Sequence, residues 1–178
     1  MADFPVSAGL EEFSGGFLST STILNRLSVT SSFSTAWPSA NLAIFVPIRI
    51  PFPVVVYKLV IGAGATAAGN FDVGIYDASG NRLVSSGATA KGASTEQVLD
   101  IADTTIGPGL FYLAMSADGT NNYVMTTPSG SSPVPLQKVR LVGVVQMAAA
   151  YVLPATATFA AASTAVAIPA INAQMRPY

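Results

Sequence analysis

The chain has 178 residues, which is long enough for one domain whose core needs neither a metal nor a disulfide. Only 10% of the residues are charged, against roughly 25% in an average soluble domain, and 51% are hydrophobic. Such a chain either enters a membrane or buries much of its surface through assembly. The net charge of −1 argues against the basic surface that nucleic-acid binding requires.

Cysteine and histidine are both absent from the sequence. The first absence excludes disulfides and thiolate chemistry, and the second removes the commonest acid–base catalyst and metal ligand. We therefore expect no catalytic residues, no metal and no cofactor. The residues from Met1 to Pro5 lack the basic start and apolar core of a signal peptide, so we expect no export signal.

Residues 1–40 are predicted to form an extended N-terminal arm. Ser and Thr crowd residues 19–22 and 28–35, and neither a period of 2 nor one of 3.6 is sustained. Residues 11–27 could form a short helix, and Gly15-Gly16 disfavours a long one. We expect the arm to lie on a neighbouring subunit, so that its deletion leaves the remaining domain, residues 41–178, folded.

Beyond residue 40 the pattern predicts short strands separated by turn signals. Pro47 and Pro51 make the first, residues 42–50, an edge or interrupted strand. Residues 71–76 alternate, which places Phe71, Val73 and Ile75 on one face. Further strands are predicted at 54–61, 82–84, 96–101, 110–117, 123–126, 139–145 and 164–168. Short strands at spacings of about ten residues predict an all-β fold, a jelly-roll-like antiparallel β-sandwich.

The segment from Asp77 to Asn81 gives the clearest local signal, a β-hairpin. Asp77 is expected to open a type I turn, and Gly80 to take the left-handed conformation that glycine adopts without strain. The alternation of Asp77, Ser79 and Asn81 also resembles the start of a calcium loop, but no Glu stands at its twelfth position. The hairpin is the better interpretation.

The stretch between Arg140 and Arg176 contains no charged residue. Residues 141–153 are almost wholly apolar, yet Gln146 interrupts them and Pro154 ends them, short of the about 20 residues that a membrane-spanning helix needs. Ala and Thr dominate after residue 153, and lipid contact favours larger side chains. We expect no membrane span. Instead, residues 141–175 should be extended, contribute at least one strand and place an Ala/Thr surface against another subunit.

Few side chains could support catalysis. A serine nucleophile would need a lysine as its base, and none stands in a Ser-x-x-Lys motif: the lysines are Lys58, Lys91 and Lys138. Two acids in a cleft could cleave a glycosidic bond, but solvated strand and turn positions explain the candidates better: Asp72, Asp100 and Asp103. We expect that the protein is not an enzyme, with a hydrolase as the remaining alternative.

Aromatic side chains could stack on the sugars of a receptor: Trp37, Tyr57, Tyr76, Tyr112 and Tyr123. They are scattered and have few acidic or amide neighbours, so a role as core or interface anchors is the better interpretation. We expect the subunit interface to draw on apolar residues of the arm and of the charge-free stretch: Phe4, Leu10, Phe13, Phe17, Trp37, Tyr151 and Phe159.

Three runs of the sequence resemble β-sandwich virion proteins of tailed bacteriophages. They are Ala40-Asn-Leu-Ala-Ile-Phe-Val-Pro-Ile-Arg49, Gly69-Asn-Phe-Asp-Val-Gly-Ile-Tyr-Asp-Ala-Ser-Gly-Asn-Arg-Leu-Val84 and Leu110-Phe-Tyr-Leu-Ala114. Residues 153–159 and Ile168-Pro169 are similar to these proteins as well. The resemblance implies a component of the phage particle and no catalytic residues.

Two components fit this resemblance. One is a capsid decoration (cement) protein, which would be a homo-oligomer, with a trimer favoured, that stabilises the head by bridging subunits of the major capsid protein. The other is a tail-fibre, receptor-binding or adaptor domain of the virion. A fibre usually has a long repetitive shaft, and this chain has none, which favours the capsid surface. Neither interpretation involves nucleic acid or a membrane as a partner.

Overall fold

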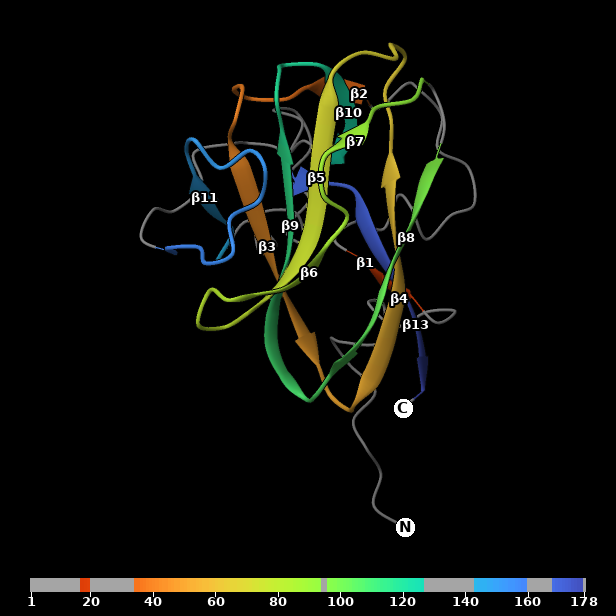
Figure 1. Ribbon diagram of the computed structural model, residues 1–178, viewed down its shortest axis with the longest axis vertical. Helices are drawn as coiled ribbons and strands as arrows, with labels where there is room; N and C mark the ends of the chain where they lie inside the picture. The colour runs from red at the N-terminus through yellow and green to blue at the C-terminus, as the bar shows by residue number, and fades with distance from the viewer. Residues whose placement is uncertain (1–16, 20–33, 94–95, 127–142, 160–167, 178) are drawn as a thin grey trace, which may run out of the picture.

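The computed structural model describes residues 17–19, 34–93, 96–126, 143–159 and 168–177 (Figure 1). Within these ranges the chain is all-β, and its strands pair antiparallel. One large sheet, which we call the β4 sheet, contains β1 (Phe17–Ser19), β13 (Ile171–Pro177), β4 (Val54–Gly62) and β8 (Glu96–Ile106) in that order. It lies at the right of Figure 1.

The second large sheet, the β5 sheet, lies at the left and centre of Figure 1. Its order is β11 (Val145–Met147), β3 (Ala43–Ile50), β9 (Gly109–Ala117), β5 (Asn70–Asp77) and β6 (Arg82–Ser85), and β7 (Thr89–Ala90) also pairs with β5. A small sheet at the top of the view contains β12 (Ile168–Pro169), β10 (Asn122–Thr126) and β2 (Ser34–Ala36).

The strands of the two large sheets are wound as a nested series. β1 pairs with β13, β3 with β9, β4 with β8 and β5 with β6. Along the chain, the first of these strands therefore meets the last, the second meets the second-last, and so on inward to the β5–β6 hairpin. Successive members alternate between the two sheets except at that hairpin. This is the winding of a jelly roll, so the predicted fold class is confirmed.

The main core fills the space between the two large sheets. Phe71, Val73 and Ile75 all point into it from β5, as their alternation predicted. The intervening residues of β5 are buried too: Asp72, Gly74 and Tyr76. An alternating strand with one solvated face would expose these three, so another part of the chain covers the outer face of the β5 sheet.

Pro47 lies where β3 is paired on one side only among the described residues. β9 pairs with the whole of β3, whereas β11 pairs only with residues 43–45. A proline has no N–H for a second neighbouring strand, so its place beyond the end of β11 agrees with the predicted interrupted edge.

The described parts of residues 1–40 belong to the sheets. β1 is the first strand of the jelly roll, and β2 pairs with β10. The Trp37 side chain is 1% exposed, and its ring N–H donates to the Leu42 carbonyl at 3.0 Å. Residues on both sides of position 40 thus belong to the same sheets and core. The expectation of a separate N-terminal arm is therefore corrected for residues 17–19 and 34–40.

The charge-free C-terminal stretch contributes strands where it is described, as predicted, but it is extended only in part, because turns and bends occupy residues 148–149 and 151–152. It supplies β11, β12 and β13, and β13 lies between β1 and β4 in the middle of its sheet. The predicted strands at 139–145 and 164–168 overlap β11 and β12 at one residue each. Residues 143 and 144 are described but belong to no strand, and residues 139–142 and 164–167 lie outside the described residues. Among the described residues, no helix is long and apolar enough to cross a membrane.

Candidate interaction surface

Residues 143–159, which we call the strap, cover the outer face of the β5 sheet. The strap contains β11 and runs in light blue at the left of Figure 1. Ala150, Leu153 and Ala157 of the strap form a second buried cluster with Phe45 and Tyr76 of the sheet. This cluster is separate from the main core, because the β5 sheet lies between them.

Aromatic rings fix the end of the strap. The Phe159 ring lies 4.3 Å from the Tyr112 ring and 5.3 Å from the Phe45 ring, measured between centroids. Phe45 in turn meets Tyr76 edge-on at 5.1 Å. Such contacts stabilise a pair by about 0.5–1.5 kcal/mol beyond the area that they bury, so the strap is held firmly on this side.

Polar side chains of β5 and β6 hold the backbone of the strap. The Asp72 carboxylate accepts a hydrogen bond from the Leu153 N–H at 3.0 Å. The Tyr76 hydroxyl donates to the Pro154 carbonyl at 2.6 Å, and the Arg82 guanidinium donates to the Leu153 carbonyl. Burial raises the pKa of Asp72, and it also raises the pKa of Tyr76.

The β5–β6 hairpin makes backbone contacts with the strap. The Ala157 N–H donates to the Gly80 carbonyl at 2.7 Å, and the Arg82 N–H donates to the Ala155 carbonyl at 2.9 Å. Gly80 has φ of 87°, which confirms the left-handed conformation predicted for it. A Cβ at this position would lie 2.2 Å from the Ala157 carbonyl oxygen, so the strap is a second reason for glycine here.

Both oxygens of the Asp77 carboxylate accept hydrogen bonds from residues of the same hairpin. One oxygen accepts the N–H groups of Ser79 and Asn81, each at 2.9 Å, and the other accepts the Asn81 side-chain amide at 2.9 Å. These hydrogen bonds lower the pKa of Asp77, with the Asn81 side chain contributing most. The geometry is that of a turn, and it agrees with the hairpin interpretation over the calcium loop.

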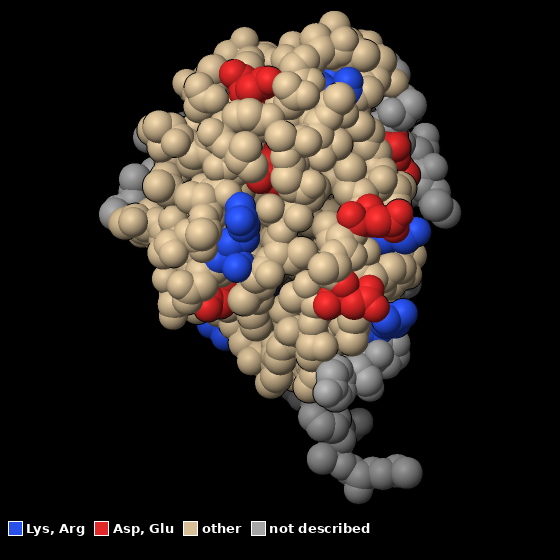
Figure 2. Space-filling view, viewed as in Figure 1, with Lys and Arg blue, Asp and Glu red and all other residues tan. Residues whose placement is uncertain are grey.

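The outward surface of the strap is uncharged and built of small side chains. Ala148, Ala149 and Ala155 are exposed, Val152 is 43% exposed, and Tyr151 is half-buried. The left edge of Figure 2, where Figure 1 shows β11, is almost free of red and blue atoms. Red and blue atoms gather instead along the right edge, where Figure 1 shows β8 and β13.

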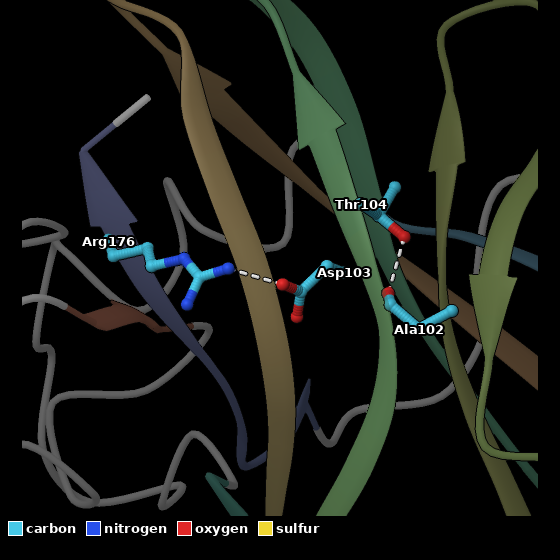
Figure 3. Close-up of polar contacts among 4 residues, drawn as sticks. All are labelled: Ala102, Asp103, Thr104 and Arg176. Atoms are coloured by element: carbon cyan, nitrogen blue, oxygen red, sulfur yellow. Dashed lines mark hydrogen bonds and ion pairs between the residues drawn. The ribbon is translucent and has the colours of Figure 1, made fainter.

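The outer face of the β4 sheet carries cross-strand ion pairs. Lys58 Nζ lies 3.5 Å from the Asp100 carboxylate. Arg176 reaches across β4 to Asp103, and the two side chains are joined in Figure 3. The Arg176 guanidinium also lies 5.7 Å from the centre of the Tyr57 ring. These pairs are exposed, so this face is suited to water.

The residues predicted for an interface are only partly brought together. Tyr151 and Phe159 both lie on the strap, but Trp37 is in the core and offers no surface to a partner. Phe4, Leu10 and Phe13 lie outside the described residues, and only the backbone of Phe17 is described, in β1. Ala155 belongs to the Ala/Thr surface that the sequence predicted, whereas Ala148, Ala149 and Val152 were not predicted individually; the lack of charge between residues 140 and 176 was the signal that pointed to them.

The acids considered for hydrolysis do not share a site. Asp100 and Asp103 lie on β8 in ion pairs, whereas Asp72 is buried on the other sheet beneath the strap. The solvated position expected for Asp72 is therefore corrected, because the strap covers the face on which it lies. Among the described residues, no group of three or more acids could hold a metal ion.

Lys91 is enclosed by backbone. Its ammonium donates to the carbonyls of Gly64 and Gly92, each at 3.3 Å, and to that of Thr66. It lies 5.3 Å from the centre of the Tyr123 ring, and burial lowers its pKa. With 4% of the residue exposed, Lys91 joins two loops and has little access to a substrate.

Comparisons with known proteins give no relative. No family model matches the chain, and no match was found among the curated proteins or the solved structures. The resemblance to virion proteins stays a prediction, and the case for a function rests on the strap and the charge-bearing face opposite it.

Proposed function

We propose that this chain is a structural subunit of a tailed-phage virion and, more specifically, a capsid decoration protein that bridges subunits of the major capsid protein. The observation that carries the proposal is the uncharged outward surface of the strap on a jelly-roll scaffold. An uncharged, largely apolar surface of small side chains permits close approach of another protein, and burying it contributes about 25 cal/mol per Å².

The distribution of charge supports an orientation. The β4 sheet exposes Lys58, Asp100, Asp103 and Arg176, whose removal from water would be costly. In the proposed arrangement the strap faces the capsid or a second copy, and the β4 sheet faces solvent. Repetition of one modest contact over many copies then stabilises the head.

Matched alanine substitutions test this orientation. Ala155 on the strap and Ala102 on β8 are both exposed alanines on opposite sheets. We expect the wild-type protein and Ala102→Asp to sediment as the same oligomer, with a trimer favoured. Ala155→Asp should sediment as a smaller species with an unchanged circular dichroism spectrum, because a buried unpaired charge costs several kcal/mol. Equal sedimentation of all three proteins would show that the strap is not the interface.

The copy number in purified particles separates the head from the tail. Quantitative mass spectrometry should find many copies per particle for a decoration protein. A few copies would instead support the tail-fibre or adaptor alternative. Absence from particles would contradict the virion proposal as a whole.

A further inference from the structure

Asp72 lies beneath the strap without a cationic partner of its own. The residue is 0% exposed, and neither of the ion pairs among the described residues includes it. Arg82, the cation whose charge acts on Asp72, donates its hydrogen bond to the Leu153 carbonyl. A buried carboxylate that lacks a paired cation is costly when it is ionised, whereas the neutral acid is not.

The hydrogen bonds of the Ser86 hydroxyl favour a proton on the Asp72 carboxyl group. Its hydroxyl oxygen accepts from the Val73 N–H at 3.2 Å and lies 3.1 Å from the Gly87 carbonyl and 3.3 Å from Asp72 Oδ1. The Ser86 hydroxyl has a single proton, so it can donate either to the Gly87 carbonyl or to Asp72 Oδ1, but not fully to both. If Asp72 is protonated, its O–H donates to Ser86 and the Ser86 O–H donates to the Gly87 carbonyl, so both of these contacts are satisfied.

A second hydroxyl faces the same carboxyl group. Ser116 on β9 is the cross-strand partner of Asp72, and its buried Oγ has no hydrogen-bond partner in the part of the chain that the structure describes. Side chains at such positions lie about 4.5–5.5 Å apart at Cβ, on one face of the sheet. The titratable and charged groups whose charges act on Asp72 are Arg82 of β6, Tyr76 of β5 and Tyr151 of the strap.

We propose that the strap closes over a neutral Asp72, so that docking of the strap takes up a proton. Burial raises the pKa of Asp72, in agreement with this geometry, although hydrogen bonds from Leu153, Ser86 and Gly87 and the charge of Arg82 act in the opposite direction. With the strap open, the burial that raises this pKa would be relieved, and the carboxyl would titrate closer to its ordinary range. Acid therefore favours closure, and closure weakens as the pH rises through the pKa of the closed state.

The consequence for assembly rests on the proposed function, but the proton linkage does not. If the strap is the assembly surface, mildly acidic conditions hold that surface in its docked form. The test below measures the strap alone, so its result is independent of whether the protein assembles on a virion.

Hydrogen exchange of strap amides in the full chain tests the proposal. Exchange of peptides covering residues 150–157 is measured by mass spectrometry from about pH 4 to about pH 8 and corrected for intrinsic exchange. Protection should fall by up to about tenfold per pH unit above the ordinary pKa and then level off. Asp72→Asn imitates the neutral acid and should be well protected with no such pH dependence. Asp100→Asn removes an exposed acid and should keep the wild-type profile.

Two results would overturn the proposal. One is an Asp72→Asn profile with the same pH dependence as the wild type. The other is loss of strap protection in Asp72→Asn at every pH, which would show that the ionised carboxylate holds the strap. If Asp72→Asn does not fold, carbon-detected NMR of the wild-type Asp72 carboxyl decides the matter. A titration midpoint above the ordinary range supports the proposal, and one at or below it overturns the proposal.

Discussion

A glycine can be required by a positive φ or by lack of room for a Cβ, and comparison of Gly80 with Gly87 separates these two reasons. Both have positive φ, at 87° and 69°, so an alanine is strained at either position. At Gly80 a Cβ would also meet the Ala157 carbonyl of the strap, whereas at Gly87 nothing lies within 4 Å. The conformation of Gly80 could be predicted from the Asp77–Asn81 turn because a turn is local, but the contact with the strap depends on residues far along the chain.

We expect Gly80→Ala to destabilise the protein by more than Gly87→Ala. The backbone strain alone costs about 1 kcal/mol at each position, and only at Gly80 must the strap also move. Urea unfolding of both variants measures the difference in the free energy of unfolding. Equal losses would mean that the strap adjusts to the methyl group without cost.

Two buried tyrosines provide a second comparison between single residues. The Tyr76 hydroxyl donates to the strap, whereas the Tyr123 hydroxyl has no partner among the described residues. Tyr76→Phe should lower the free energy of unfolding by about 1–2 kcal/mol, because the Pro154 carbonyl loses its donor. Tyr123→Phe should be neutral or slightly stabilising, because it removes an unsatisfied polar group. Thermal unfolding checks both, and a larger loss for Tyr123→Phe would contradict the assigned contacts.

Among the elements, β8 shows why some boundaries could be predicted and others could not. The strand was expected to end at Ile101, because residues 103–108 look like a turn. It continues to Ile106, since Val54 and Val55 of β4 pair with that part of β8. Turn-like Asp and Thr are tolerated there because they lie at the edge of a sheet, where Asp103 pairs with Arg176 in solvent.

The short strands β1 and β2 could not be predicted, because long-range pairing defines them. Phe17 pairs with Gln174, and Thr35 pairs with Tyr123, at separations that no local pattern reports. The same limit applied to the interaction surface. The lack of charge showed that the C-terminal stretch is buried or interfacial, but only the fold shows that residues 143–159 cross the outer face of the β5 sheet.

Truncation tests the revised role of residues 1–40. Deleting residues 1–40 removes β1, β2 and Trp37, so we expect loss of the cooperative thermal transition and of the β-type circular dichroism spectrum. Deleting residues 1–16 removes none of the described strands and should leave both in place. A folded product of the longer deletion would restore the boundary at residue 40.

At the scale of the whole molecule, the outer face of the β4 sheet and the outward surface of the strap differ in charge. The β4 sheet carries the exposed ion pairs, and the strap carries no charge. Association through one face or the other therefore differs in its response to salt, because screening weakens only contacts between charges.

We expect self-association through the strap to be insensitive to sodium chloride. Sedimentation at about 0.05 M and about 0.5 M salt should give the same dissociation constant within about twofold. Sulfate, which strengthens apolar burial, should tighten association. A strong weakening in sodium chloride would instead assign the contact to the β4 sheet.

The nested winding also affects the order in which the strands can pair during synthesis. β1 is the first jelly-roll strand to leave the ribosome, and its partner β13 follows all the other jelly-roll strands along the chain. The β4 sheet acquires its β1–β13–β4 centre only after those strands have been made. Until then, the apolar faces of β3, β4 and β5 have no complete sandwich to close them. We therefore expect the sandwich to close only once β13 is available and to fold slowly, as is usual for a topology dominated by distant pairings.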